Sequence, residues 1–376
     1  MPGPLDDLLV VDLSRVLAGP FTGMLLADLG ARVIKVERPG AGDDSRAYGP
    51  FAGDRSYYFA RVNRGKESIA VDLKSDGGRA VVEALLDRAD ILIENFRPGV
   101  MERLGYGPAA LTERWPALIG LSLSGFGHTG PWSHRPAYDA VVQGMAGVMS
   151  ITGDADGEPT KPGIPIADLS AGLYGAIAIL SALHERQRTG KGQHLDVAMF
   201  DTTLSLLEGA ALHYLARGVS PARIGNAHFA IAPFDTFRCA DRSITICAAN
   251  DALFATLLEV LNIPEAGDDP RFRTNALRHD HRDALKAVLE AALAGDTGAN
   301  WLERLGDAGV PCGPVMDVGE AVSSPQAEAR NMIIEAGGLR LPGNPIKSSA
   351  HPDPLTRPSA PEVDADGDAI RTWLGL

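Results

Sequence analysis

Short apolar runs and amphipathic segments alternate through the first part of the chain. Five runs are nearly all apolar and rich in β-branched residues, as in strands whose two faces are both buried: Leu8–Leu13, Arg32–Glu37, Ser68–Leu73, Ile91–Phe96 and Leu118–Ser124. The segments between them carry apolar positions at helical spacing: Pro20–Leu29, Gly77–Ala89 and Gly107–Trp115. This alternation predicts βαβ units, which right-handed crossovers build into an α/β fold with an open, doubly wound, Rossmann-like sheet.

Longer helical patterns follow, and after them the sequence predicts a second, smaller domain. The helical patterns cover Ala137–Met149, Asp168–Arg188 and Asp201–Arg217, with a further strand at residues 192–200. We therefore expect a large α/β domain over residues 1–217, completed by residues 325–376, and a small α+β domain over residues 225–320. Linkers at about 218–225 and 316–330 would join them. Prolines recur from Pro342 onward, so the tail is expected to lie extended on a surface.

Charge and cysteine content exclude several classes of function. The chain has 35 Lys and Arg against 48 Asp and Glu, a net charge of −13. Nucleic-acid binding is therefore not expected, because phosphate neutralisation needs clustered Lys and Arg. The three cysteines form no CxxC pair, so neither a metal site nor a disulfide framework is expected. No signal-peptide pattern or full-length membrane span stands out, so we expect a cytoplasmic protein without a membrane partner.

Four basic residues stand just beyond the predicted strands. Arg38, Lys74 and Arg97 follow the second, third and fourth strands, and Arg103 lies slightly further on. Because parallel strands end at one edge of a sheet, these cations are expected to gather there. They would then form a positive pocket for a ligand with several phosphates. The alternative is that they are separate, solvated loop charges.

Asp168 is the best single candidate for chemistry. It follows a proline-rich approach, stands before Ser170-Ala-Gly172 and begins a long apolar helix. One interpretation is an N-cap aspartate, worth about 1 kcal/mol. The other is a covalent nucleophile, since small neighbours permit a substrate to approach closely.

Several sequence blocks together resemble the class III CoA-transferases, the family that also contains α-methylacyl-CoA racemases. The blocks include VVDLSRVLAGPFTGMLLADLGARVIKVERPG, NRGKESIAVDLKSDGG, ADILIENFRPGVMERLGYG, RPAYDAVVQGMAGVMSITG and ADLSAGLYGAIAILSALHERQ. They run in order over about residues 5–205, and weaker similarity continues beyond. The resemblance implies that Asp168 is the nucleophile that transfers CoA between carboxylic acids, by way of an aspartyl anhydride and an aspartyl-CoA thioester.

The resemblance also implies how CoA binds, as a substrate rather than a tightly held cofactor. The positions that match the family's CoA contacts are Val16, Leu17, Ala18, Arg38, Val71, Lys74, Asn95, Phe96, Arg97, Arg103, Ala137 and Tyr138. Family members form interlocked homodimers in which each subunit threads through the other, so the same assembly is expected here.

Two departures from the family pattern bear on the reaction. Leu17 stands where formyl-CoA transferases usually carry Gln, and their run of lid glycines is absent, which argues against a formyl/oxalate pair. The resemblance then favours succinyl-CoA or a related donor. Tyr138 stands where racemases need a histidine, and tyrosine is a weak base near neutral pH. A transferase is therefore preferred; the alternatives are a racemase with Asp168 as proton-transfer base and a non-catalytic CoA-binding protein.

Overall fold

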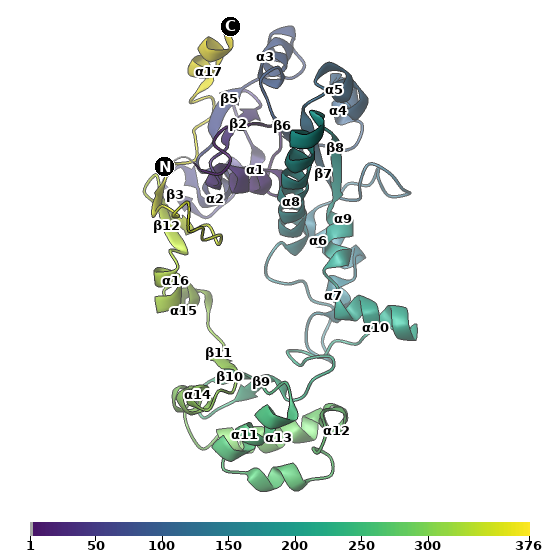
Figure 1. The fold of residues 1–376 in the computed structure, drawn as a ribbon, viewed down its shortest axis with the longest axis vertical. Coiled ribbons are helices and arrows are strands. Elements are labelled where there is room, and N and C mark those ends of the chain that lie inside the picture. Colours follow the sequence, from purple (N-terminus) through teal and green to yellow (C-terminus); the bar gives the residue numbers. More distant parts are fainter. Residues whose placement is uncertain (1–2) are drawn as a thin grey trace. The chain divides into compact units, whose positions relative to one another are not determined.

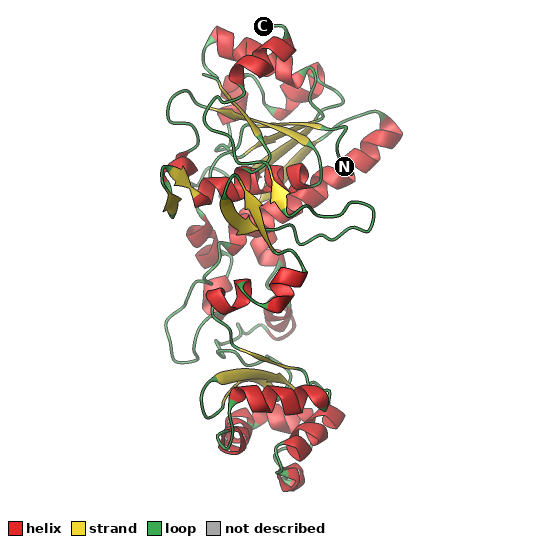
Figure 2. Cartoon of the chain, turned by 90° about the vertical axis from the view of Figure 1, so that its left-hand side faces the viewer, coloured by secondary structure: helices red, strands yellow, loops and turns green. Residues whose placement is uncertain are grey.

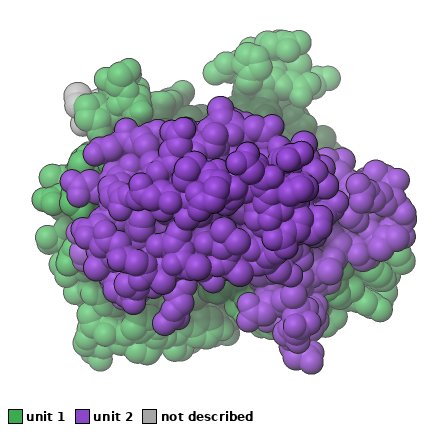
Figure 3. All heavy atoms as spheres, turned by 90° about the horizontal axis from the view of Figure 1, so that it is seen from below, with its two compact units in different colours: residues 1–148, 161–208, 324–376 green, residues 149–160, 209–323 purple. Residues whose placement is uncertain are grey.

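The computed structural model describes residues 3–376 and divides the chain into two compact units (Figure 3). The larger unit comprises residues 1–148, 161–208 and 324–376, and the smaller one comprises residues 149–160 and 209–323. Three separate stretches of chain thus build the larger unit, which contains Asp168.

A six-stranded parallel sheet forms the centre of the larger unit (Figure 1). Its strands are β1 (Leu9–Asp12), β2 (Arg32–Glu37), β5 (Glu67–Ala70), β6 (Ile91–Glu94), β7 (Ile119–Ser124) and β8 (His194–Ala198). The order β5-β2-β1-β6-β7-β8, with every neighbouring pair parallel, is that of a doubly wound sheet, so the predicted α/β fold is confirmed. The order reverses between β1 and β6, and ligands of such sheets bind at that point, beyond the carboxyl ends of the strands.

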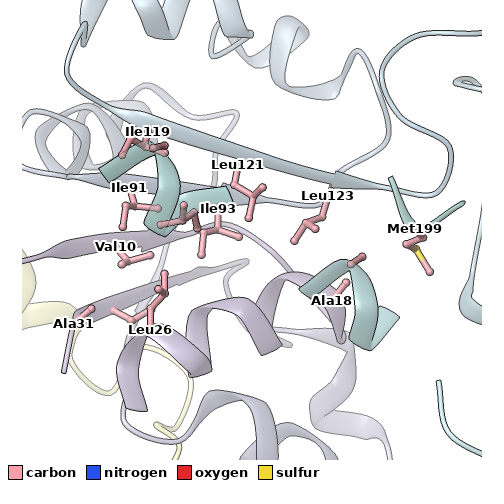
Figure 4. Close-up of a cluster of buried hydrophobic side chains, with 14 of the residues drawn as sticks. Val10, Ala18, Leu26, Ala31, Ile91, Ile93, Ile119, Leu121, Leu123 and Met199 are labelled. Atoms are coloured by element: carbon pink, nitrogen blue, oxygen red, sulfur yellow. The ribbon is translucent and has the colours of Figure 1, made fainter. Parts of the chain in front are cut away.

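Helices cover both faces of this sheet (Figure 2). On one face lie α1 (Ala18–Asp28) and α8 (Ile166–Thr189), which share a core with alternate strand residues such as Val10 and Ile93 (Figure 4). On the other face lie α3 (Asp76–Leu86), α4 (Val100–Leu104) and α5 (Pro108–Arg114), whose core includes Val11 and Leu92. Burial on both faces explains why the strands read as continuous apolar runs.

The end of the chain contributes a helix to that second face. Helix α17 (Gly367–Leu374) buries Ile370 and Leu374 in the core with α3, and Arg88 bonds the carbonyl of Trp373. The expectation of a wholly extended tail is therefore wrong. Its prolines are confined to the residues before α17, and the helix itself is amphipathic.

Two of the long helical patterns are each broken into two helices. The pattern at 137–149 gives α6 (Asp139–Met145) and α7 (Val148–Ile151), which are separated where Gly147 adopts a φ of +92°. The pattern at 201–217 gives α9 (Met199–Ser205) and α10 (Gly209–Arg217), with Glu208 at a φ of +40° between them. The prediction of single helices is wrong in both places, because apolar spacing continues across a short backbone break.

The remaining elements of the larger unit surround the sheet. They are η1 (Asp44–Ala47), β3 (Phe51–Ala52), β4 (Arg55–Ser56), α2 (Tyr57–Asn63), α16 (Pro325–Ala329), β12 (Ile333–Ala336), β13 (Leu339–Pro342) and β14 (Thr356–Arg357). Strands β12, β13 and β14 form a small sheet whose apolar side packs with Ala60 of α2. Helix α2 begins at the N-cap Ser56, whose Oγ accepts from the N–H of Phe59.

The smaller unit has its own core. Its antiparallel sheet, in the order β11-β10-β9, contains β9 (Phe234–Arg238), β10 (Ser243–Cys247) and β11 (Cys312–Pro314). Besides α10, described above, its helices are α11 (Asp251–Val260), η2 (Pro264–Asp268), α12 (Asn275–Asp280), α13 (Arg282–Leu293), α14 (Gly298–Asp307) and α15 (Val318–Val322). Phe237, Ile244, Leu257, Leu289 and Trp301 are buried together between strands and helices.

Helix α8 is apolar on both of its sides. Its length and composition alone would qualify it as a membrane span. One side packs against α1 and β7. On the other side Leu173, Tyr174, Ile177 and Leu180 are 40–59% exposed. This exposed apolar stripe needs a covering surface, which a partner protein or a lipid could provide.

Candidate active site

Asp168 lies in the first turn of α8 but does not cap the helix. The N-cap residue is Pro165, which offers no side-chain hydrogen bond. The cap comes from Asp139, whose Oδ1 accepts from the N–H groups of Ala167 at 2.9 Å and of Asp168 at 3.4 Å. The interpretation of Asp168 as an N-cap is therefore wrong, and its carboxyl group is available for chemistry.

The surroundings of Asp168 favour its neutral form. Burial, together with the negative charge of Asp139, raises the pKa of this carboxyl to about 7. Burial and the charge of Asp168 in turn raise the pKa of Tyr58, on α2, to about 12. A carboxyl that titrates near neutral pH can be either acid or nucleophile under working conditions, which is common at functional sites.

Asp168 lines a cavity of about 150 Å³, which we call the Asp168 cavity. Eight other residues of the sequence-based site line it too: Val16, Leu17, Ala18, Asn95, Phe96, Arg97, Ala137 and Tyr138. They come from the loops after β1 and β6, from the start of α1 and from the segment before α6. The switch point of the sheet thus brings together residues that lie up to 152 positions apart.

A larger cavity of about 290 Å³ lies at the same edge of the sheet, and we call it the Arg38 cavity. Arg38, Val71, Lys74 and Phe96 line it, so Phe96 belongs to both cavities. Arg103 lines neither, although Val100 and Leu104 of its helix α4 line the Arg38 cavity.

A carboxylate links the two cavities. Asp44 lines both and accepts from Arg38 at 2.6 Å and from Arg15 at 3.0 Å. Both arginines are more than half exposed, so these ion pairs are weak and solvated. The guanidinium groups can therefore exchange Asp44 for a phosphate at little cost.

The segment after β7 approaches the site closely. A Cβ atom added at Gly125 would lie 2.2 Å from the Cβ of Ala137, and both residues line the Asp168 cavity. Only glycine permits this contact, which brings the Ala137–Asp139 segment against the sheet edge.

Sequence reasoning missed several residues of the site. Asp139 and Tyr58 interact with Asp168 from distant positions in the sequence, and Asp44 pairs with Arg38 across a loop, so no periodic pattern marks any of the three. Arg135 lines the Asp168 cavity and belongs to the RPAYD block, so its position beside Tyr138 was the available signal. Across residues 3–376, no group of three or more His, Cys, Asp or Glu side chains is placed to hold a metal ion.

Comparison with known proteins identifies the family. The model of CoA-transferase family III matches residues 5–367, nearly the whole chain. The chain belongs to this family. Acetyl-CoA:oxalate CoA-transferase of Acetobacter aceti is 52% identical over 370 residues, which cover 98% of this chain and 95% of the relative. Succinyl-CoA:glutarate CoA-transferase of Mus musculus is 40% identical over 364 residues, which cover 94% and 84%.

A solved structure of the family shares the fold. A CAIB/BAIF family protein from Brucella suis matches with a TM-score of 0.89 and 43% identity over the full length of both chains. The chain is therefore a family III CoA-transferase, and its relatives use CoA thioesters as substrates. The resemblance predicted from the sequence is confirmed.

Proposed function

We propose that this transferase moves CoA from a short acyl-CoA, such as succinyl-CoA or acetyl-CoA, to a dicarboxylic acid through covalent intermediates on Asp168. The observation that carries the proposal is the position of Asp168. Its half-buried carboxyl group takes no part in capping α8, and it lines a cavity at the edge of a doubly wound sheet where such sheets bind ligands. The names of the relatives support the substrate class.

The reaction proceeds in four acyl transfers. The ionised carboxylate of Asp168 attacks the thioester carbonyl of the donor, which forms a mixed anhydride and releases CoA thiolate. The thiolate attacks the aspartyl carbonyl, forms an aspartyl-CoA thioester and releases the donor acid. The acceptor carboxylate attacks this thioester, forms a new anhydride and releases the thiolate again. The thiolate finally attacks the acceptor carbonyl, which yields the product thioester and restores Asp168.

A carboxylate is the nucleophile that this sequence of steps requires. After attack, the aspartyl carbonyl is itself an activated acyl group, so CoA can leave and return. A serine or cysteine would hold the donor's acyl group as an ester or thioester with no carbonyl of its own to accept CoA, so the returning thiolate could only regenerate the donor acyl-CoA.

The CoA moiety lies along the sheet edge in this proposal. Its phosphates bind in the Arg38 cavity, where Arg38 and Lys74 provide positive charge, with Arg97 and Arg103 nearby. Its thioester reaches the Asp168 cavity past Val16 and Leu17. The two adjoining cavities suit a long ligand with a charged end and a reactive end.

Arg135 suits the second carboxylate of the acceptor. The relatives are named for oxalate, glutarate and mesaconate, all of which carry two carboxyl groups. Arg135 lines the cavity of Asp168 and lies over the ring of Trp132, 5.4 Å from its centroid. One carboxylate of the acceptor can then face Asp168 while the other pairs with this guanidinium.

Replacing Arg135 is expected to affect dicarboxylic acceptors selectively. Arg135→Ala should raise the KM for a dicarboxylic acid about 10-fold, since a charge-assisted bond to the distal carboxylate is lost. The KM for a monocarboxylic acid of equal chain length, measured with the same donor, provides the control and should change little. Equal changes for both acids would count against a role in acceptor binding.

The rate of acyl transfer is expected to rise with pH through the pKa of Asp168. Attack needs the ionised carboxylate, whose pKa is about 7, so the rate falls below that pH. Asp139→Asn removes a like charge and keeps an oxygen that can cap α8. It should therefore lower the pKa of Asp168 and shift the rise of the rate with pH to lower pH. The pH profile of kcat/KM for both proteins is the measurement, and an unshifted limb would contradict the assignment.

The exposed stripe of α8 fits an interlocked homodimer, in which a second copy covers it. Leu173, Tyr174, Ile177 and Leu180 expose apolar surface that a stable partner would bury. Threading of one subunit through the other would explain why the larger unit is built from three stretches of chain.

The proposed function is tested by trapping the covalent intermediate. The enzyme is incubated with succinyl-CoA or acetyl-CoA, treated with borohydride, and examined by intact-protein mass spectrometry and peptide mapping. A CoA-linked mass, or reduction at Asp168, is the expected result. Absence of any adduct together with α-proton exchange in deuterated water would favour a racemase instead. Absence of both would leave a CoA-binding protein.

A further inference from the structure

Val16 has a backbone conformation that its side chain disfavours. Its φ is +68°, in the left-handed region, where β-branched residues are true outliers. Such a conformation costs about 1–3 kcal/mol and persists only where the surroundings impose it. Val16 belongs to the loop of residues 13–17 between β1 and α1, and it lines the Asp168 cavity.

Asp43 binds the backbone of Val16 in this conformation. Both of its carboxylate oxygens accept from the N–H of Val16, at 3.1 and 3.2 Å. Lys35 pairs with the same carboxylate at 2.9 Å, and the N–H and Oγ of Ser45 bond its Oδ1 at 2.9 and 2.7 Å. The backbone N–H of Asp43 donates in turn to a carboxylate oxygen of Glu37 at 2.8 Å. The carboxylate that holds Val16 is thus itself fixed on several sides.

The rest of the loop is held in the same way. Asp12 accepts from the N–H of Ser14 at 2.9 Å, and Lys35 donates to the Ser14 carbonyl at 2.8 Å. The side chain of Asn95 bonds both the N–H and the carbonyl of Arg15, at 2.9 and 2.8 Å. Side chains therefore bond every backbone polar group from the N–H of Ser14 to the N–H of Val16.

The charges involved are almost fully buried. The side chains of Lys35 and Asp43 are each 1% exposed. Burial alone would raise the pKa of Asp43, but Lys35 and the bonds from Ser45 lower it to about 2, so the carboxylate stays ionised. A buried ion pair contributes little net stability compared with apolar side chains. Its position next to the strained backbone of Val16 therefore points to a role other than stability.

We propose that Asp43 is a positioning residue for acyl transfer. It holds Val16 in the left-handed conformation and so fixes the part of the wall of the Asp168 cavity that Val16 forms, against which the substrate lies when it reacts with Asp168. This inference rests on the proposed function. Asp43 also lines the Arg38 cavity, so one carboxylate sets the relation between the CoA-binding part and the reacting part of the site.

The test measures the rate of adduct formation at saturating acyl-CoA. Asp43→Asn keeps the shape of the side chain but loses the charge and one acceptor, and should lower this rate about 100-fold, the cost of a displacement of about 1 Å at a reacting centre. Adding Val16→Gly in the same chain should recover at least about 10-fold, because glycine adopts a positive φ without strain. A purely structural role for Asp43 would give no such rescue.

Asp28→Asn is the matched control. Asp28 is a buried carboxylate of the same unit that pairs with Arg64 at 2.6 Å and touches neither the loop nor a cavity. This variant should lose stability and keep the adduct rate. If Asp43→Asn does not fold, Ser45→Ala removes one bond to Asp43 and should lower the rate about 3-fold.

The outcomes separate this inference from the proposed function. No adduct with the wild-type enzyme would overturn the proposed function. An adduct with the wild type that forms equally fast in Asp43→Asn, or in Ser45→Ala when only that variant folds, would overturn the positioning role alone. A slow Asp43→Asn variant that Val16→Gly does not rescue would also overturn it, since the strain at Val16 would then be irrelevant.

Discussion

Asp168→Asn is expected to lower CoA transfer by about 10³-fold or more, because an amide can neither attack a thioester nor carry the acyl group. The Kd for CoA should stay nearly unchanged, since in the proposed binding mode the phosphates lie in the Arg38 cavity, which Asp168 does not line. Transfer is measured by chromatography of the CoA thioesters and binding by calorimetry. Asp168→Ala serves as control against deamidation of the new asparagine. Turnover retained by both variants would contradict the mechanism.

The same substitution is expected to stabilise the fold at alkaline pH. An unfolded aspartate has a pKa of about 3.9, whereas folding raises that of Asp168 to about 7. The folded state therefore binds the proton more tightly, and this stabilisation is present at acid pH and lost as the pH rises through 7. Above that pH the wild type carries a buried charge at a cost of up to about 4 kcal/mol. Urea unfolding should show a gain for Asp168→Asn at pH 8 and little gain at pH 4.

Asp12→Asn is expected to lower the free energy of unfolding of the larger unit by about 3–5 kcal/mol. The side chains of Asp12 and Lys66 are both fully buried and lie 2.8 Å apart, so the variant leaves a buried ammonium group without its counter-charge. Burial already lowers the pKa of Lys66 to about 8, despite the attraction of Asp12. Urea unfolding followed by circular dichroism measures the change.

Glu83→Gln is the comparison for that experiment. Its pair with Arg114 has a similar length, 2.9 Å, but both side chains are about 40% exposed. Solvent screens such a pair, so the variant should change the free energy of unfolding by less than about 1 kcal/mol. Equal losses in the two variants would show that burial does not set the energetic weight of the Asp12–Lys66 pair.

The central sheet could be predicted because its signal is local. The run Arg32–Glu37 coincides with β2, and the other predicted strands of the sheet differ from the observed ones by a few residues at their ends. Helix α2 and strand β9 were missed, because each is short and lies in a segment with turn residues on both sides. Helix α17 was missed because the prolines before it dominated the composition.

The candidate site was predictable only in part, for a related reason. Cations such as Arg38 and Lys74 follow strands directly, so the topology of the sheet determines where they gather. The cap that Asp139 gives to α8 joins residues 28 positions apart in separate segments, which no periodicity reveals. The hold of Asp43 on Val16 joins two loops and depends on a backbone angle that the sequence does not encode locally.

The contribution of α17 to the larger unit has a consequence for synthesis of the protein. One face of the central sheet receives Ile370 and Leu374, although its last strand, β8, ends at Ala198. A ribosome adds about 5–20 residues per second, so the finished strands wait on the order of ten seconds or more for that cover. During this interval a nascent chain displays apolar sheet surface, and chaperones that bind such surface have their longest opportunity to act.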